Sequence, residues 1–270
     1  MERKELVMGP LVYSYLTAGT GGKLLLCLHG FGEEASSFSF LEEVAGEQFT
    51  IVAPDLPWHG QTTWNGSLDF SVSDFLALVE ALIPAEQYPN FHLLCYSMGG
   101  RAGLCLLQHL PHRIASAVLL APDGLKMNPW YWLATQTQAG NRLFRYTMQH
   151  PQWFTGIVNT LNRLRLINSS ISKYVHRFLD DQQARTDLYH IWTTFRQLRP
   201  HLKKVQQQIG HQNIPVQLVF GRYDRIIPPE NGRRLQTGAE TQVHIHQLAA
   251  GHQLLKPKHA AFIFSLLSAE

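Results

Sequence analysis

Short apolar segments alternate with segments of helical periodicity along most of the 270-residue chain. The apolar segments predict β-strands at 11–16, 24–28, 50–54, 91–96, 115–121, 216–220 and 242–248. The helical patterns predict helices at about 72–82, 99–110, 229–236 and 257–267. Continuous apolar runs such as LLLCL and AVLLA are typical of strands covered on both faces. The alternation therefore predicts an α/β fold, with a mostly parallel central sheet and flanking helices.

The alternation stops after Pro122 and returns after Pro215. The segment between them has helical patterning and many aromatic residues, among them Trp130, Tyr131 and Trp132. A single domain interrupted by a helical insertion is the simplest explanation of this pattern. We expect residues 1–124 and 210–270 to form the α/β core, and residues 125–209 to form the inserted helical segment.

The composition fits a folded chain with one large core, since 45% of the residues are hydrophobic and 16% are charged. The N-terminal segment MERKELVMGP lacks the apolar stretch of a secretory signal, and no apolar run is long enough to span a membrane. Three cysteines in apolar stretches indicate buried thiols in a reducing compartment. We therefore expect a cytoplasmic protein with no metal, no cofactor and no nucleic-acid partner. The oligomeric state stays open.

Positive charge is concentrated in the segment from Lys126 to Ile209. It holds twelve Lys or Arg residues and three Asp residues, a net charge of +9, whereas the rest of the chain carries −6. One interpretation is that the segment supplies cations to an anionic ligand. The other is that its helices simply have basic, solvated surfaces.

The sequence Cys95-Tyr96-Ser97-Met98-Gly99-Gly100 follows a predicted strand and opens a predicted helix. This is the context of a nucleophile elbow, a sharp turn that exposes a serine hydroxyl at the edge of the sheet. Small residues two positions before and after the serine let strand and helix pass closely, and Cys95 stands where a glycine is usual. We predict that Ser97 is a nucleophile.

The sequence Leu28-His29-Gly30-Phe31-Gly32 follows the second of the predicted apolar strands. Acyl transfer needs two backbone N–H groups that stabilise an oxyanion, one after the nucleophile and one in this loop. We therefore expect an oxyanion hole formed by the backbone N–H groups of Met98 and Phe31.

A base and an acid follow in the order that this architecture uses. Asp224 ends the strand-and-loop sequence VFGRYD, and His252 lies in AGH after the last predicted strand. A serine needs a base to take its proton, and the base needs an acid to fix its tautomer. Asp123, which follows another strand, is an alternative acid, but the loop context favours Asp224.

Along nearly its whole length the chain resembles the α/β-hydrolase superfamily. The matching motifs are LHGFG, DLPWHGQT, YSMGG, FGRYD and AGH. The resemblance implies a cap domain at the insertion, a small-molecule substrate and no cofactor. Trp58 and Thr62 depart from the family's D-x-x-G-H-G-x-S pattern.

The elbow also resembles the 2-succinyl-6-hydroxy-2,4-cyclohexadiene-1-carboxylate synthase family of menaquinone biosynthesis. That resemblance rests on Tyr96-Ser97 followed by Gly99-Gly100-Arg101. It implies substrate contacts from Tyr96 and Arg101, and from a cap arginine such as Arg142 or Arg145.

The pattern favours a serine hydrolase that acts on a small, anionic ester or thioester. Three alternatives remain: a synthase-like lyase that eliminates pyruvate, a C–C bond hydrolase, and a module that binds a ligand without turning it over. The aromatic, basic insertion could also rest on an anionic membrane.

Overall fold

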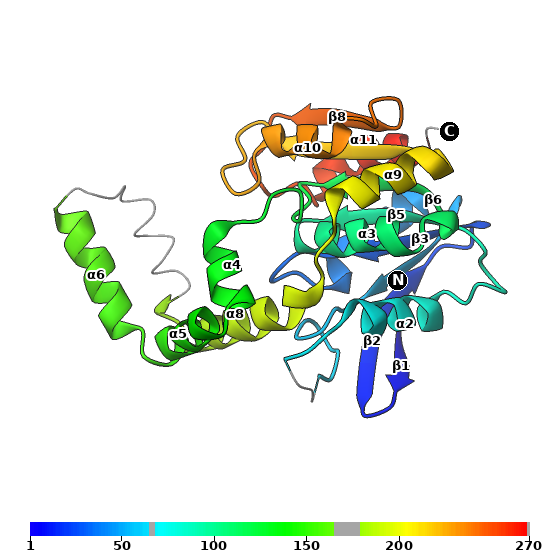
Figure 1. Ribbon diagram of the computed structural model, residues 1–270. Helices are drawn as coiled ribbons and strands as arrows, with labels where there is room; N and C mark the ends of the chain where they lie inside the picture. The colour runs from blue at the N-terminus through cyan, green and yellow to red at the C-terminus, as the bar shows by residue number, and fades with distance from the viewer. Residues whose placement is uncertain (65–67, 165–178, 269–270) are drawn as a thin grey trace. The chain divides into compact units, whose positions relative to one another are not determined.

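Within the described residues, eight strands form one sheet in the order β1-β2-β4-β3-β5-β6-β7-β8, as Figure 1 shows for this computed structural model. The structure describes residues 1–64, 68–164 and 179–268. The pairings β1–β2 and β2–β4 are antiparallel, and every pairing from β4 through β3, β5, β6 and β7 to β8 is parallel. The strands are β1 Glu2–Met8, β2 Leu11–Ala18, β3 Lys23–Leu28, β4 Phe49–Pro54, β5 Phe91–Tyr96, β6 Ile114–Leu120, β7 Val216–Gly221 and β8 Val243–Leu248.

Helices connect the parallel strands and cover the sheet. The described α-helices are α1 Leu41–Ala45, α2 Val72–Leu82, α3 Met98–His109, α4 Pro129–Gln136, α5 Gln138–Gln149, α6 Gln152–Arg163, α8 Gln182–Thr194, α9 Leu202–Gln212, α10 Arg233–Gln236 and α11 Ala260–Leu267. The boundaries have local causes. Helix α2, for example, begins at a capping box in which Ser71 accepts from the Asp74 N–H and Asp74 accepts from the Ser71 N–H.

The central strands are buried because both of their faces are covered. Cys27 of β3 and Leu94 of β5 pack with Phe38, Leu41 and Ile263 on one side of the sheet. Helix α3 packs on the strands β3, β5 and β6, and α9 packs on α3 (Figure 1). This double cover explains why these strands are continuous apolar runs and not alternating ones.

The predicted α/β fold is confirmed. All seven predicted strands are present within a residue or two of the expected ends, and the predicted helices are α2, α3 and the short helical stretches that contain α10 and α11. The strand β1 was not predicted. Its sequence ERKELVM carries four charged residues, and it lies at the sheet edge, where it pairs with β2.

The chain divides into two compact units, which we call the core unit and the helical unit. The core unit comprises residues 1–66, 71–126 and 198–270, and the helical unit comprises residues 67–70 and 127–197. The sequence placed the second boundary at residue 209, whereas the core unit resumes at residue 198, because α9 packs on α3 and belongs to the core unit. Part of the expected cap, residues 165–178, lies outside the described residues.

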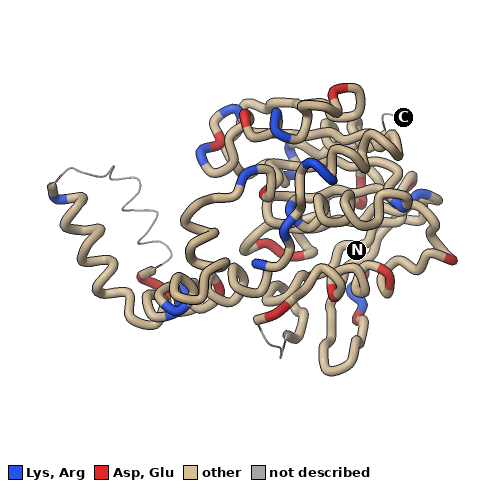
Figure 2. The backbone as a smooth tube through the Cα atoms, viewed as in Figure 1, with Lys and Arg blue, Asp and Glu red and all other residues tan. Residues whose placement is uncertain are grey.

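This division changes the distribution of charge. Lys126, Arg199, Lys203 and Lys204 lie in the core unit, and Asp69 joins the helical unit, which therefore holds eight Lys or Arg against four Asp. Figure 2 shows the described basic positions of the helical unit spread along its chain. The net charge of the helical unit is thus +4, well below the +9 of the segment defined from sequence. Among the described residues, no helix is both long and apolar enough to cross a bilayer.

Candidate active site

Ser97 occupies a strained turn between β5 and α3. Its φ of 50° and ψ of −112° lie where residues with a side chain are rarely found. The turn is held by its own backbone: the Ser97 N–H donates to the Leu120 carbonyl at 2.9 Å, and the Ser97 carbonyl accepts from the N–H groups of Gly100 and Asp123, both at 2.9 Å. Strain that persists under such restraint is typical of functional positions.

The glycines after Ser97 are required by close approaches of the backbone. A Cβ on Gly99 would lie 2.1 Å from the Leu28 carbonyl oxygen, and a Cβ on Gly100 would lie 2.5 Å from the Pro122 Cβ. Helix α3 can therefore start directly against the ends of the neighbouring chain segments. The sequence GG after Ser97 was the signal for this geometry.

Gly103 was not singled out from the sequence, although it explains how Cys95 is tolerated. A Cβ on Gly103 would lie 2.6 Å from the Cys95 Sγ. The strand position that is usually glycine here carries the Cys95 side chain, and the glycine that leaves room for it is Gly103 in the helix. The spacing of eight residues between Cys95 and a glycine inside an apolar helix was the available signal.

Ser97, His252 and Asp224 lie in one hydrogen-bonded chain. The Ser97 Oγ lies 2.9 Å from the His252 Nε2, and the His252 Nδ1 lies 2.7 Å from the Asp224 Oδ2. These residues come from the end of β5, the loop after β8 and the loop after β7, so the parallel strands deliver all three to the same edge of the sheet. In this arrangement Asp224 accepts the Nδ1 proton, which leaves Nε2 free to accept from Ser97.

The Asp224 carboxylate is fully buried and held by three donors. Its Oδ1 accepts from the N–H groups of Ile226 at 2.8 Å and Ile227 at 3.0 Å, and its other oxygen faces His252. Burial alone would raise the pKa of Asp224, but these hydrogen bonds and the nearby His252 outweigh it and hold the pKa below its ordinary value. Asp224 is therefore an anion at neutral pH.

The loop after β3 lies against the nucleophile. A Cβ on Gly30 would lie 2.9 Å from the Tyr96 Cδ1 and 3.2 Å from the Ser97 Cβ. Only a glycine lets the chain approach Tyr96 and Ser97 this closely. Phe31 follows Gly30 in this loop, and Met98 follows Ser97 as the first residue of α3; their role as oxyanion donors stays a prediction.

His29 ties this loop to the loop after β4. Its Nδ1 donates to the Gly30 carbonyl at 2.8 Å, and its Nε2 accepts from the Leu56 N–H at 3.0 Å. Burial, with a smaller effect of neighbouring His59, lowers the pKa of His29 to about 3. The imidazole is therefore neutral, as its one donor and one acceptor contact require.

Tyr96 has a structural contact on the other side of the site. Its phenol donates to the His252 carbonyl at 3.3 Å, and its ring centroid lies 5.5 Å from that of His252. Burial raises the pKa of Tyr96, with additional effects of Glu33 and Asp224, so the phenol keeps its proton.

The remaining predicted residues are not part of the hydrogen bonds that join Ser97, His252 and Asp224. Arg101 and Asp123 form an ion pair, with the Arg101 side chain 9% exposed and the Asp123 side chain 31% exposed. Arg142 and Arg145 both lie on α5 in the helical unit, where Arg145 lines a cavity. Among the described residues, no group of His, Cys, Asp and Glu side chains could hold a metal ion.

A mostly parallel sheet with a serine on a strained strand-to-helix turn, and a histidine and an aspartate on later loops, defines an enzyme of the α/β-hydrolase class. Residues 25–259 match the Alpha/beta hydrolase family, and the chain belongs to that family.

Several known proteins similar to this chain are named as hydrolases. The uncharacterized hydrolase YugF of Bacillus subtilis is 25% identical over 93% of this chain and 90% of its own length. The 2-hydroxy-6-oxononadienedioate/2-hydroxy-6-oxononatrienedioate hydrolase 1 of Pseudomonas putida is 24% identical over 86% of this chain and 82% of its own length. A hydrolase of Pseudomonas aeruginosa has the same fold, with a TM-score of 0.69 over 99% of this chain and 98% of its own, at 17% identity.

Proposed function

We propose that the chain is a serine hydrolase in which Ser97 is the nucleophile, His252 the general base and Asp224 the residue that orients the base. The observation that carries this proposal is the continuous chain of hydrogen bonds from Ser97 through His252 to the buried Asp224. As Ser97 attacks a carbonyl carbon, His252 takes its proton at Nε2 and later donates that proton to the leaving group. Asp224 stabilises the imidazolium that forms between these steps.

The backbone N–H groups of Phe31 and Met98 would stabilise the oxyanion. Met98 is the first residue of α3, so its N–H is one of those that have no partner within the helix. The approach of Gly30 to Ser97 and the hydrogen bond from His29 to the Gly30 carbonyl support a fixed position for Phe31. Donors fixed in this way act without reorganisation during the reaction.

The substrate we propose is a small anionic ester or thioester, which the helical unit would select as a cap. The net charge of the helical unit, +4, supports an anionic substrate. The buried thiols of Cys27, Cys95 and Cys105 are free and support a cytoplasmic location.

C–C bond hydrolysis is a second candidate, because a relative that covers most of the chain is named for the hydrolysis of an oxo-dienedioate. The pyruvate-eliminating reaction has less support. It would use the Arg101 guanidinium for the substrate, and that group is paired with Asp123.

A fluorophosphonate probe tests the proposal directly, because it reacts only with an activated serine. The probe should label the wild-type chain and Ser39→Ala, a control that removes an exposed serine hydroxyl. It should not label Ser97→Ala, whose kcat on a p-nitrophenyl ester should fall by about 10⁴–10⁶. Turnover by Ser97→Ala at the wild-type rate would reject the proposal. A vinylogous 1,5-diketone offered in parallel would separate the C–C hydrolase from the ester hydrolase.

A further inference from the structure

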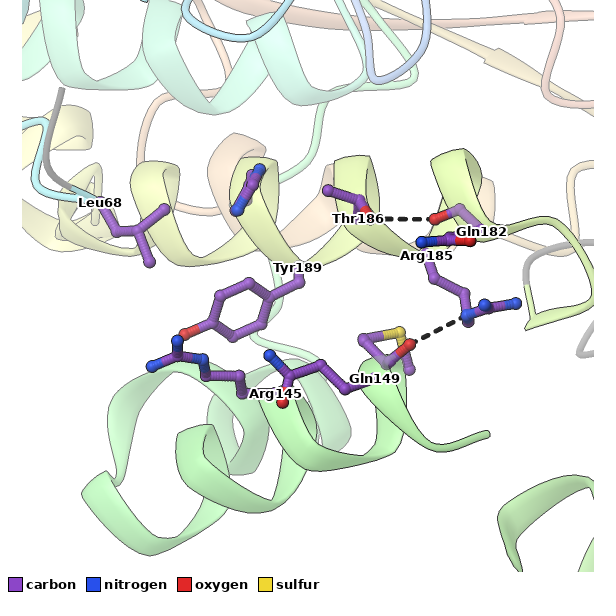
Figure 3. A pocket seen from close by; sticks show the side chains of 9 residues that line it. Leu68, Arg145, Gln149, Gln182, Arg185, Thr186 and Tyr189 are labelled. Atoms are coloured by element: carbon purple, nitrogen blue, oxygen red, sulfur yellow. Dashed lines mark hydrogen bonds between the residues drawn. The ribbon is translucent and has the colours of Figure 1, made fainter. Parts of the chain in front are cut away.

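The helical unit contains a cavity of its own. Helices α5 and α8, together with Leu68, line a partly open cavity of about 430 Å³, a volume that suits a small metabolite. Figure 3 shows side chains from the two helices facing each other across it. The nine residues that line the cavity are Leu68, Arg145, Met148, Gln149, Gln182, Arg185, Thr186, Tyr189 and His190.

The lining carries positive charge and no negative charge. Two of the nine residues are arginines, and none is Asp or Glu. The other polar members, which include Gln149, Gln182 and Thr186, are neutral groups that can donate hydrogen bonds. A lining of this composition is complementary to an anion and gives a cation no carboxylate to bind.

The two arginines are engaged differently. Arg185 is held in place: its Nε donates to the Met148 carbonyl at 2.9 Å, and its Nη1 donates to the Leu179 carbonyl. Arg145, by contrast, has no hydrogen bond or ion pair within the described parts of the chain, and its side chain is exposed. A planar guanidinium with its donors available is the group best suited to bind a carboxylate or a phosphate in two-point fashion.

His190 keeps the lining from becoming more strongly charged. Burial lowers the pKa of His190; nearby Asp187 acts to raise it, while the positive charge of Arg145 acts to lower it. The imidazole is therefore largely neutral at pH 7 and adds a hydrogen-bonding group without adding charge. Asp69, Asp181 and Asp187 are each adjacent in sequence to a lining residue. Asp69 forms an ion pair with Arg196, Asp181 accepts from the Ala184 N–H at 2.6 Å, and Asp187 accepts from the Gln183 amide at 2.8 Å.

We propose that this cavity binds the carboxylate or phosphate group of a small ligand, with Arg145 as the principal cation and Arg185, Gln149 and Gln182 as supporting groups. The site lies wholly within the helical unit. It does not depend on the chemistry proposed for Ser97, and its ligand can be the anionic end of the substrate or a separate effector.

Binding of inorganic phosphate and of malonate to the full chain tests the site. Binding is measured as the transverse relaxation of the ³¹P signal and as saturation transfer to the malonate methylene protons. Both anions should bind the wild type, and Arg145→Gln should weaken that binding about ten- to a hundredfold. Arg142→Gln is the matched control, since Arg142 is on the same helix, is also exposed and does not line the cavity. It removes the same charge and should leave binding close to the wild-type value.

Equal binding by wild type and Arg145→Gln would overturn the site, and so would equal weakening in the two variants, which would indicate general attraction to a basic surface. Kinetic measurements then show whether the site binds the anionic group of the substrate or a separate ligand. Competitive inhibition by phosphate of the hydrolysis of a neutral ester, lost in Arg145→Gln, assigns the site to the substrate's own anionic group. Binding that depends on Arg145 but leaves turnover unchanged assigns it to a separate ligand. A chain that binds phosphate through Arg145 and resists the fluorophosphonate probe would reject only the serine mechanism.

Discussion

Arg101 binds Asp123 beside the nucleophile elbow, one helical turn after Ser97. The pair couples the first turn of α3 to the loop after β6, and the same loop donates the Asp123 N–H to the Ser97 carbonyl at 2.9 Å. Each partner was a candidate for another role, Arg101 as a substrate cation and Asp123 as the acid of the triad. Because each charge is compensated by the other, we infer that the pair stabilises the nucleophile elbow.

The pair predicts opposite phenotypes for two conservative changes. Asp224→Asn should keep the fold and lower kcat by about 10²–10⁴, because an amide favours the wrong tautomer of His252. Asp123→Asn should keep most of the activity but destabilise the chain by about 1–3 kcal/mol, because it removes the carboxylate that pairs with the buried Arg101 guanidinium. Thermal unfolding of both variants measures the loss of stability. Ester turnover, measured below their melting temperatures, measures the loss of activity separately.

A double variant controls for the loss of charge. R101M/D123L removes both members of the pair and should be more stable than Asp123→Asn alone, since the buried guanidinium is removed together with its carboxylate. If Asp123→Asn is inactive but fully stable while Asp224→Asn turns over normally, the acid of the triad has been assigned to the wrong residue.

Much of the fold could be predicted because its signals are local. The apolar runs of β3, β5 and β6 follow from burial on both faces, and the CYSMGG sequence combines a strand end, a strained turn and a helix start. Ser97, Asp224 and His252 follow parallel strands that end at one edge of the sheet, so the sequence also predicts that they meet. The three residues meet in the structure at 2.9 Å and 2.7 Å.

What could not be predicted depends on contacts between distant segments. Strand β1 is charged and becomes a strand only because β2 offers it a partner. Helix α9 has the same periodicity as the helices before it, and only its packing on α3 assigns it to the core unit. The pairing of Arg101 with Asp123 depends on how closely α3 passes the loop after β6, which no pattern in either segment encodes.

Cys95 and Gly103 should show strong coupling in a double-mutant cycle. Gly103→Ala should destabilise the chain by about 1–3 kcal/mol, because its Cβ would lie 2.6 Å from the Cys95 Sγ. In a Cys95→Gly background the space is free, and the same change should become stabilising by up to about 1 kcal/mol, since alanine favours a helix more than glycine. The free energy of unfolding in urea, measured for all four chains, gives the coupling. Effects that simply add would mean that strand and helix adjust independently at this contact.

Gly30→Ala should damage catalysis more than stability. The added methyl would press on the Tyr96 ring and the Ser97 Cβ, at 2.9 Å and 3.2 Å, and would displace the Phe31 N–H from the position proposed for the oxyanion. A displacement of roughly 1 Å can lower the rate about a hundredfold, so kcat should fall while KM changes little. Gly22→Ala is the control, because a Cβ there meets nothing within 4 Å. Wild-type kcat in Gly30→Ala would mean that the loop does not contribute an oxyanion donor.

His29 should make the stability of the chain depend on pH below neutrality. Its pKa is lowered to about 3 in the folded chain, whereas an exposed histidine has a pKa of about 6.5. Below pH 6.5 the unfolded chain binds a proton at His29 that the folded chain cannot accept. The stability of the fold therefore decreases as the pH is lowered from 6.5 to about 3. Above pH 6.5 neither state binds this proton, and the full contribution of the neutral imidazole is present.

The variant His29→Gln isolates this effect, because glutamine can donate and accept hydrogen bonds but does not titrate. At pH 8 the wild type should be the more stable chain, since its imidazole joins the Gly30 carbonyl to the Leu56 N–H with fitted geometry. As the pH falls from 7 to 5, that advantage should shrink by about 2 kcal/mol, the linkage expected for one proton excluded from the folded state. Urea unfolding of both chains at pH 8, 7, 6 and 5 measures the difference directly. Parallel curves would show that His29 is protonated in the folded chain as readily as in the unfolded one. The neutral bridge between the two loops would then have to be abandoned.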